Sequence, residues 1–274
     1  MITQKSIEQF QGLSLSRGRD FLYLSPHILL HPYISCYTVT LPAEMSDEYT
    51  ILPTASSTMI ISVSNEDIFA SLRGVNTKAC TVGAYANKMK LLLLIEFHSG
   101  GLCPFIKTDQ FELTDGSFDL QELDKALTRT IEQELIRSEG IKELVEALDR
   151  IFLTRLINNN RGKDIGALTK KIILQKGGIS TRELSSELNY SERHIRRLFL
   201  QYVGTTPKIF SRIVRVNYAL RLIQGSPAPL IDVTAQAGFF DQPHFIHDFK
   251  SICGMTPMEY VRNMSVYYND EFKM

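Results

Sequence analysis

Two stretches decide the fold of the second half of this chain: Ile195-Arg-Arg-Leu-Phe-Leu-Gln-Tyr-Val-Gly-Thr-Thr-Pro207 and, fifty residues later, Phe245-Ile-His-Asp-Phe-Lys-Ser-Ile-Cys-Gly-Met-Thr-Pro257. Each begins with two apolar residues four positions apart, which lie on one face of a helix. In each, the glycine suits a left-handed helix end, and the Thr-Pro pair suits an N-cap followed by proline at the first helical position. Glu259 completes a capping box in the second copy. The repeat therefore predicts two copies of one helical unit.

A second short helix is expected before each copy. Ser180–Leu188 precedes the first copy, and Leu230–Phe239 precedes the second. When Tyr190 is aligned with Phe239, the two upstream helices match at an offset of 49 residues instead of 50, so the second unit has one more residue in its turn. A short helix, a tight turn and a second helix form a helix-turn-helix unit, whose second helix enters the major groove of DNA.

The segment between the copies predicts one long connecting helix from Thr206 to Gln224, which the run Gly225-Ser226-Pro227 ends. At about 1.5 Å per residue this helix is roughly 28 Å long. It can therefore place two recognition helices in successive major grooves, about one DNA turn of roughly 34 Å apart. One face is apolar and most of the arginines lie off it; the apolar residues are Ile209, Ile213, Val216, Leu220 and Ile223.

Positive charge is concentrated in the repeated half. Residues 1–159 hold 14 Lys+Arg and 20 Asp+Glu, a balance of −6, whereas residues 160–274 hold 16 and 10, a balance of +6. Between Tyr190 and Arg221 there are seven positive residues and one acid, Glu192. A basic half joined to an acidic half is expected when only one half meets a polyanion. The charge therefore favours a phosphate-facing surface over a duplicated bundle that binds protein or has only a structural role.

A run of residues in the second copy matches a known pattern: Gly238-Phe-Phe-Asp-Gln-Pro-His-Phe245, followed by Phe249-Lys250, Gly254, Thr256-Pro257 and Tyr260. The first copy has a counterpart in Glu183-Leu-Ser185, Tyr190-Ser191 and Arg197-x-Phe199. Over residues 164–263 the sequence resembles the AraC/XylS-type bacterial transcription regulators. The resemblance implies a module of seven helices that reads two adjacent major grooves. The implied base contacts are Arg193, Arg196, Arg197, Gln242, Pro243, Ile246 and His247.

The chemistry of these side chains suggests different roles. Arg196 and Arg197 can each offer a bidentate fork to guanine, worth about 1–3 kcal/mol of discrimination. Arg212, Arg215 and Lys250 are expected to contact phosphate and so set position instead of sequence. Where the family commonly has an arginine and a small polar residue, this chain has His247 and Ile246. Thr234 likewise stands where an alanine is usual. We therefore expect most base-specific contacts at the first unit.

The first half of the sequence predicts a mostly-β domain. Short runs rich in β-branched and other apolar residues occur at Ile34–Thr40, Thr58–Val63, Ala79–Val82 and Leu91–Phe97. The segments from Ile95 to Phe105 and from Glu112 to Leu120 are similar to sensor segments of the same family, which implies a cupin-like domain that binds a small effector. The polar stretch 158–163 is expected to be a linker. The expected fold class is α+β, with a β-rich domain over 1–160 and an all-α domain over 164–264.

Two amphipathic helices, at 119–137 and 140–157, are expected to follow the strands, because leucine and isoleucine recur there at three- and four-residue steps. Two fates are open to these stripes. They can form the interface of a homodimer, which the family resemblance favours, or they can pack back onto the β-domain.

Several classes of site and protein are not indicated by the sequence. We expect no metal site, because His194, His244 and His247 lie beside no cluster of ligands, and Pro32 breaks the helical face that His27 and His31 would need. No phosphate-binding glycine loop or nucleophile elbow indicates an enzyme or a cofactor. The four cysteines are scattered, as expected of reduced cytoplasmic thiols. Neither a signal peptide nor a membrane span is indicated.

The sequence thus predicts a cytoplasmic transcription regulator that is not an enzyme. Its expected partners are double-stranded promoter DNA and a second copy of the chain, with a small effector and RNA polymerase as further candidates, and it is expected to act as an activator. Two alternatives remain: a cupin-like enzyme with an attached DNA-targeting module, and an adaptor that binds protein through its helices. Bound metal would favour the first, and a lack of duplex affinity the second.

Overall fold

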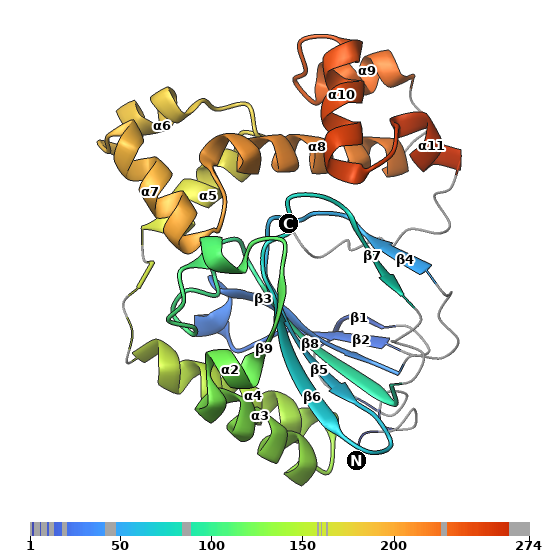
Figure 1. Ribbon diagram of the computed structural model, residues 1–274, viewed down its shortest axis with the longest axis vertical. Helices are drawn as coiled ribbons and strands as arrows, with labels where there is room; N and C mark the ends of the chain where they lie inside the picture. Colours follow the sequence, from blue (N-terminus) through green and yellow to red (C-terminus); the bar gives the residue numbers. More distant parts are fainter. Residues whose placement is uncertain are drawn as a thin grey trace.

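The computed structural model divides into a β-rich amino-terminal part and a helical carboxy-terminal part (Figure 1), which confirms the predicted α+β class. It describes residues 2, 6, 10, 14–17, 21–41, 48–83, 89–157, 159, 161–162, 164–225 and 229–262. Within these residues, no helix combines the length and the apolar character needed to cross a membrane.

The described strands form two antiparallel sheets. The larger sheet has the order β1-β2-β3-β8-β5-β6-β9, and β4 pairs with β7 in the smaller one. The bounds are β1 (Ser14–Arg17), β2 (Phe21–Leu24), β3 (Ile34–Thr40), β4 (Glu48–Ile51), β5 (Thr58–Val63), β6 (Ile68–Arg73), β7 (Cys80–Gly83), β8 (Leu91–Phe97) and β9 (Ser117–Asp119). Three of the predicted strands coincide with β3, β5 and β8, and the fourth is displaced by one residue, to β7.

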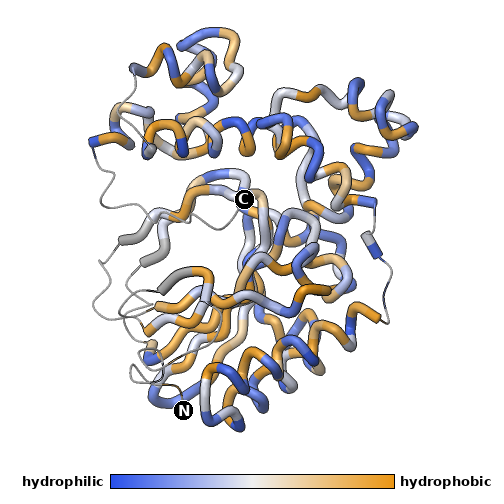
Figure 2. Tube along the Cα trace, turned by 180° about the vertical axis from the view of Figure 1, so that it is seen from behind, coloured by the Kyte–Doolittle hydropathy of each residue, from blue (hydrophilic) through white to orange (hydrophobic). Residues whose placement is uncertain are grey.

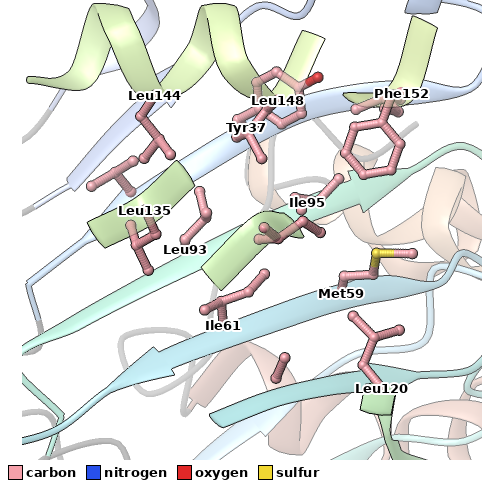
Figure 3. Close-up of a cluster of buried hydrophobic side chains, with 14 of the residues drawn as sticks. Tyr37, Met59, Ile61, Leu93, Ile95, Leu120, Leu135, Leu144, Leu148 and Phe152 are labelled. Carbon is pink, nitrogen blue, oxygen red and sulfur yellow. The ribbon is translucent and has the colours of Figure 1, made fainter. Parts of the chain in front are cut away.

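Three helices cover one face of the larger sheet: α2 (Leu120–Leu123), α3 (Lys125–Arg137) and α4 (Ile141–Ile157). In Figure 2 the strands are mostly hydrophobic, while α3 and α4 alternate between hydrophobic and hydrophilic residues. Figure 3 shows Leu135 and Leu144 of the helices packed over Leu93 and Ile95 of β8, and all four are buried. Burying such a side chain stabilises a fold by about 1.5–3 kcal/mol.

The apolar stripes of α3 and α4 are therefore part of the core. Leu127 and Ile131 of α3, like Leu148 and Phe152 of α4, have no exposed surface. Of the two fates that the sequence left open, packing onto the β-domain is the one that the structure adopts. The expectation of a dimer formed through these stripes is wrong, because the sheet already occupies them.

The first of the two predicted helices is also interrupted. Asp124 leaves the helical conformation between α2 and α3, and its side chain accepts a hydrogen bond from the Leu127 amide at 2.9 Å. Arg155 of α4 donates to the same carboxylate at 2.6 and 3.2 Å. Burial by itself raises the pKa of Asp124, but these hydrogen bonds outweigh it and lower that pKa. The periodicity of leucine runs across this break, so it does not reveal the break.

Seven helices lie between residues 164 and 262 of the described chain. They are α5 (Ile165–Leu174), α6 (Thr181–Leu188), α7 (Glu192–Tyr202), α8 (Pro207–Gly225), α9 (Leu230–Gln236), α10 (Gln242–Cys253) and α11 (Pro257–Arg262). The long helix α8 runs between the group α5–α7 and the group α9–α11 (Figure 1). It is buried over more of its circumference than its apolar stripe predicts, since Val214 and Asn217 are buried as well as Ile213 and Leu220.

The two parts of the molecule are in direct contact. Ala55, Val75 and Cys103 of the β-rich part belong to the same buried cluster as the apolar residues of α5–α11. Asn217 of α8 donates to the carbonyl of Pro53 at 2.8 Å, which satisfies a polar side chain that is only 8% exposed. The helical part therefore packs against loops of the β-rich part.

Candidate nucleic-acid interface

The first helix-turn-helix unit consists of α6 and α7. Ser180 and Glu183 form a capping box at the start of α6, with bonds of 2.8 and 3.2 Å. The hydrogen bonds that Ser180 donates to the Glu183 carboxyl lower its pKa. The helix ends at Asn189, whose φ of 55° is left-handed, a conformation that asparagine tolerates. Ser191 then caps α7 by accepting from the His194 amide at 3.2 Å. Two polar residues thus close the turn and orient α7.

Helix α7 has one buried and one exposed face. Ile195, Leu198 and Phe199 are buried, whereas Arg193, Arg196 and Arg197 are exposed. Within the part of the chain that the structure describes, none of these three arginines forms an ion pair with a carboxylate. The first recognition helix therefore presents three guanidinium groups together.

The second unit, α9 and α10, repeats this plan with different residues. Asp241 caps α10 by accepting from the His244 amide at 2.8 Å, and Pro243 follows in the first turn. Phe245 and Phe249 are buried where the first unit has Ile195 and Phe199. Gly254 ends the helix with a φ of 76°, and Gly204 has a φ of 90° after α7, as the repeat predicts.

The predicted capping box after the second unit is also present. Thr256 and Glu259 exchange hydrogen bonds of 2.7 Å and 3.2 Å at the start of α11. The bond that the Thr256 amide donates lowers the pKa of the Glu259 carboxyl.

The presented surface of α10 carries less charge than that of α7. Gln242, Pro243, His247 and Lys250 are exposed, and Ile246 is half-buried against the helical core. Position by position, the residues from Arg193 to Leu198 are exposed or buried in the same order as those from Pro243 to Asp248, except that Ile246 is half-buried where Arg196 is exposed. The two helices thus present equivalent positions, filled by arginines in one and by a proline, an isoleucine and a histidine in the other.

Two of the three predicted phosphate contacts are engaged inside the fold. Arg212 of α8 forms an ion pair with Asp248 of α10 at 2.8 Å. Arg215 donates to the carbonyl of Gly177 at 2.8 Å and lies over the ring of Phe239, and its burial lowers its pKa. Both side chains connect α8 to neighbouring segments, while the third predicted contact, Lys250, is exposed.

Asp248 is a functional position that sequence reasoning missed. It occupies the buried position that Leu198 holds in the first unit, and its side chain is 6% exposed. Besides Arg212, the rings of His244 and His247 lie 3.5 and 3.6 Å from its carboxylate oxygens. A carboxylate in the buried register of an amphipathic helix was the available signal, because such a group needs a partner.

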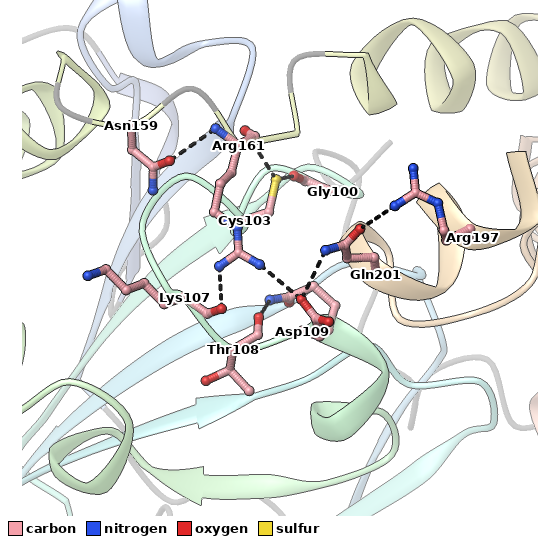
Figure 4. A network of polar contacts seen from close by, with 10 residues as sticks. Gly100, Cys103, Lys107, Thr108, Asp109, Asn159, Arg161, Arg197 and Gln201 are labelled. Carbon is pink, nitrogen blue, oxygen red and sulfur yellow. Dashed lines mark hydrogen bonds and ion pairs between the residues drawn. The ribbon is translucent and has the colours of Figure 1, made fainter. Parts of the chain in front are cut away.

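The β-rich part touches the first recognition helix through a chain of polar contacts (Figure 4). Arg197 donates to Gln201 at 3.5 Å, and Gln201 donates to the Asp109 carboxylate at 3.4 Å. Arg161, in the segment before α5, holds the same carboxylate at 2.9 Å. Nearby, Thr114 donates to the carbonyl of Gly204 at 2.6 Å. One of the expected base contacts is thus linked through hydrogen bonds to the other half of the molecule.

The second unit has a contact of its own with the β-rich part. The Ala79 amide donates to the carbonyl of Ile252, in the last turn of α10, at 2.7 Å. Each recognition helix therefore meets the β-rich part near its carboxyl end, and its amino end faces away from that contact.

The described residues hold no group of three or more His, Cys, Asp or Glu side chains arranged to bind a metal ion. All four cysteines are free thiols, and burial raises the pKa of Cys103 and Cys253 to about 12. His31 interacts with Ser25 and with the carbonyl of Pro26, both at 3.0 Å.

Comparisons with known proteins find a helix-turn-helix domain in this part of the sequence. A family model described as a helix-turn-helix domain matches residues 184–263. The HTH-type transcriptional regulator ArgR of Pseudomonas aeruginosa is 26% identical over 107 residues, which are 38% of this chain and 32% of that protein. The HTH-type transcriptional activator RhaR of Yersinia pseudotuberculosis is 35% identical over 69 residues, 25% of this chain and 24% of that protein. A solved structure of ToxT from Vibrio cholerae is 12% identical with a TM-score of 0.41, covering 82% of this chain and 98% of that one.

The chain spans about a third or less of the length of these two curated relatives, and both are named as regulators of transcription. The matched residues include both recognition helices and the helix that connects them. Through this region the chain contains a helix-turn-helix domain and is similar to proteins named as HTH-type transcription regulators.

Proposed function

We propose that the protein is a bacterial transcription regulator that binds double-stranded promoter DNA through both helix-turn-helix units. The observation that carries the proposal is the exposed face of α7, where Arg193, Arg196 and Arg197 stand together without a carboxylate partner among the described residues. Unpaired guanidinium groups on a recognition helix suit phosphate oxygens and the O6 and N7 atoms of guanine. The cupin-like enzyme remains the weaker alternative, since the relatives reported above are named as regulators.

The expected contacts divide into three groups. We assign base contacts to Arg193, Arg196 and Arg197 in the first unit and to Gln242, Pro243, Ile246 and His247 in the second. Lys250 is exposed at the edge of α10 and suits a phosphate. For Arg212 and Arg215 a phosphate contact would compete with the bonds to Asp248 and Gly177, so we assign their main role to holding α8 in place.

We further propose that the β-rich part regulates DNA binding through the contacts that reach both units. Thr114 holds the end of α7, Asn217 ties α8 to Pro53, and Ala79 holds the end of α10. A change in these loops, whether caused by an effector or by a second copy, would alter the placement of both recognition helices together. Coupling of this kind between sites is typically worth 1–3 kcal/mol.

Dimerisation stays part of the proposal, through a different surface from the one expected. Ile28 and Leu29 of η1 (Ile28–Leu30) are 67% and 62% exposed, and η1 lies against α4, with the His27 amide bonded to Asp149 at 2.9 Å. Sedimentation of the full chain tests this. We expect the wild type to be a dimer and the double variant Ile28→Ser, Leu29→Ser to be a monomer. A wild type that stays monomeric at high concentration would contradict dimerisation.

We also propose activation through contact with RNA polymerase in the cytoplasm, since one relative is named as an activator. Transcription from a promoter that carries the selected site would rise with added protein if this holds, and would fall if the protein represses.

The decisive experiment is selection of bound fragments from random duplex DNA, followed by affinity measurement at several salt concentrations. We expect a site with two elements about one helical turn apart, and affinity that falls steeply with salt. The triple substitution of Arg193, Arg196 and Arg197 by alanine should abolish specific binding. The matched control is Arg129→Ala, an exposed arginine on α3. Equal loss in both variants, or no duplex affinity in the wild type, would contradict the proposal.

A further inference from the structure

The turn of the second unit contains one residue that has no counterpart in the first. Tyr190 stacks on His194 with ring centroids 5.0 Å apart, and Phe239 meets His244 edge-on at 5.5 Å, so these two aromatic residues are equivalent. In the first unit the N-cap Ser191 follows at once. In the second unit Phe240 stands between the aromatic residue and the N-cap Asp241. The one-residue offset between the repeats is therefore located at Phe240.

The inserted side chain is almost wholly exposed. Phe240 is 92% exposed, whereas its neighbour Phe239 is 6% exposed and packs on Phe245 with ring centroids 5.0 Å apart. Single exposed apolar residues are common and need no explanation by themselves. This one is notable for its position, because it directly precedes the N-cap of the recognition helix, and the amino end of that helix enters the groove.

Apart from the N-cap Asp241, whose carboxylate accepts a hydrogen bond from the His244 amide, the presented residues next to Phe240 are uncharged and partly apolar. Positive charge comes only further along the helix. Gln242 and Pro243 are exposed in the first turn of α10, and Ile246 lies half-buried one turn on. Lys250 follows another turn on, where it can meet a phosphate. In the major groove the thymine methyl is the apolar group of a base edge, phenylalanine is among the side chains that contact it, and glutamine pairs with adenine N6 and N7.

We infer that Phe240 contacts a thymine methyl group and that the second element of the DNA site is A·T-rich. Ile246 extends the apolar surface beside this contact without reaching the methyl group, and Gln242 pairs with an adenine. The first element, which α7 reads with arginines, carries the guanines. The bound site is thus two unlike elements in a fixed order, not a direct repeat. This inference rests on the proposed function, and it adds which bases the second unit selects.

The test replaces thymine by uracil, which differs only by the missing methyl group. Duplexes from the selection are prepared with uracil at each thymine of the second element in turn, and the affinity of the full chain is measured. We expect one position where uracil weakens wild-type binding about threefold to fivefold, as removal of one buried methyl implies. Phe240→Ala should weaken binding to the thymine duplex about as much, and should bind the thymine and uracil duplexes equally.

Two controls separate this effect from others. Met258→Ala removes a 49% exposed apolar side chain from α11 and should keep the wild-type response to uracil. Arg196→Ala should lose guanine preference in the first element and also keep that response. Because Phe240 is exposed, the unfolding midpoint of Phe240→Ala should match that of the wild type, which shows that the variant folds.

Three outcomes would overturn the inference. The first is a wild-type affinity that no uracil changes, or a response to uracil that persists in Phe240→Ala. In the second, Phe240→Ala binds DNA normally but no longer activates the promoter, which would mean that the Phe240 ring contacts a protein partner instead of DNA. The third is an absence of any duplex affinity in the wild type, which overturns the proposed function as well, whereas the first two leave wild-type DNA binding intact.

Discussion

The two helix-turn-helix units share one backbone plan, and three of the differences between them concern the presented surface, the core and the turn. An exposed arginine of α7, Arg196, corresponds to the half-buried Ile246 of α10. The buried Leu198 corresponds to the buried Asp248, and the second turn has Phe240 in addition. The N-caps of α7 and α10, the glycines that follow these helices and the paired apolar residues are the same in kind, so these suffice to set the plan. Positions outside that set are free to diverge, both on the surface and within the core.

The exchange of Leu198 for Asp248 shows how such a divergence is accommodated. A carboxylate with 6% exposure needs a partner, because an unpaired buried charge is costly. Arg212 of the connecting helix supplies it, so the second unit is bound to α8 by an ion pair where the first unit uses apolar packing. The difference makes the second unit dependent on a residue outside itself.

The largest effect that would sharpen this comparison is expected from Arg212→Ala. Removing the arginine leaves the buried Asp248 without a guanidinium partner and with only the two histidine rings beside it, which we expect to lower the free energy of unfolding by about 3 kcal/mol. Urea denaturation measures this. The double variant Arg212→Met with Asp248→Leu imitates the first unit and should be close to wild type in stability. If Arg212→Ala were neutral, the ion pair would not hold the second unit.

The two cap glycines offer the next test. Both have positive φ, but a Cβ on Gly204 would lie 2.8 Å from the Gln110 carbonyl oxygen and from the Thr114 hydroxyl, whereas one on Gly254 would meet nothing within 4 Å. Gly254→Ala should cost about 1 kcal/mol, the strain of the left-handed conformation. Gly204→Ala should cost about 2–3 kcal/mol, because steric overlap with the β-rich part adds to that strain. If thermal denaturation showed the same loss of stability for both variants, the contact of Gly204 with the β-rich part would adjust to the added methyl group at little cost.

Base recognition should differ between the equivalent positions of the two units. Arg196→Ala should relax the preference for one guanine by about 1–3 kcal/mol, measured as the affinity ratio between the selected duplex and one changed at that base pair. Ile246→Ala should have no effect on any guanine. A consensus that Arg196→Ala leaves unchanged would contradict the register in which we place α7 on DNA.

The smallest effect is expected from Lys250→Ala. A single phosphate contact should weaken binding to all sequences alike and reduce the slope of log affinity against log salt by about 0.9. Arg193→Ala is the matched variant in the first unit, and it should change both the slope and the base preference. If Lys250→Ala altered the preference for particular bases, Lys250 would belong with the base contacts.

The sequence alone predicted features that depend on residues close together in the chain. The Thr256–Glu259 capping box, the glycine caps and the strands β3, β5 and β8 follow from local spacing, and all are confirmed. The offset of the two repeats even located an extra turn residue, although not its exposure. Such features are accessible because helix caps and side-chain periodicity act over a few residues.

Contacts between distant segments escaped sequence reasoning. Asp124, at the break between α2 and α3, is paired with Arg155, 31 residues away, and the link from Asn217 to Pro53 spans 164 residues. The leucine stripes of α3 and α4 looked equally suited to a partner chain and to the sheet, because an apolar face does not specify what covers it.

The repeat by itself determined that this chain has two recognition helices, and its composition determined that the first is the more basic. Only the tertiary structure decided which cations remain available. Arg193, Arg196 and Arg197 are exposed, while Arg212 and Arg215 are engaged with Asp248 and with the carbonyl of Gly177. The physical reason is that a cation close to a buried acceptor forms a bond with it, and that closeness in space cannot be read from the order of residues.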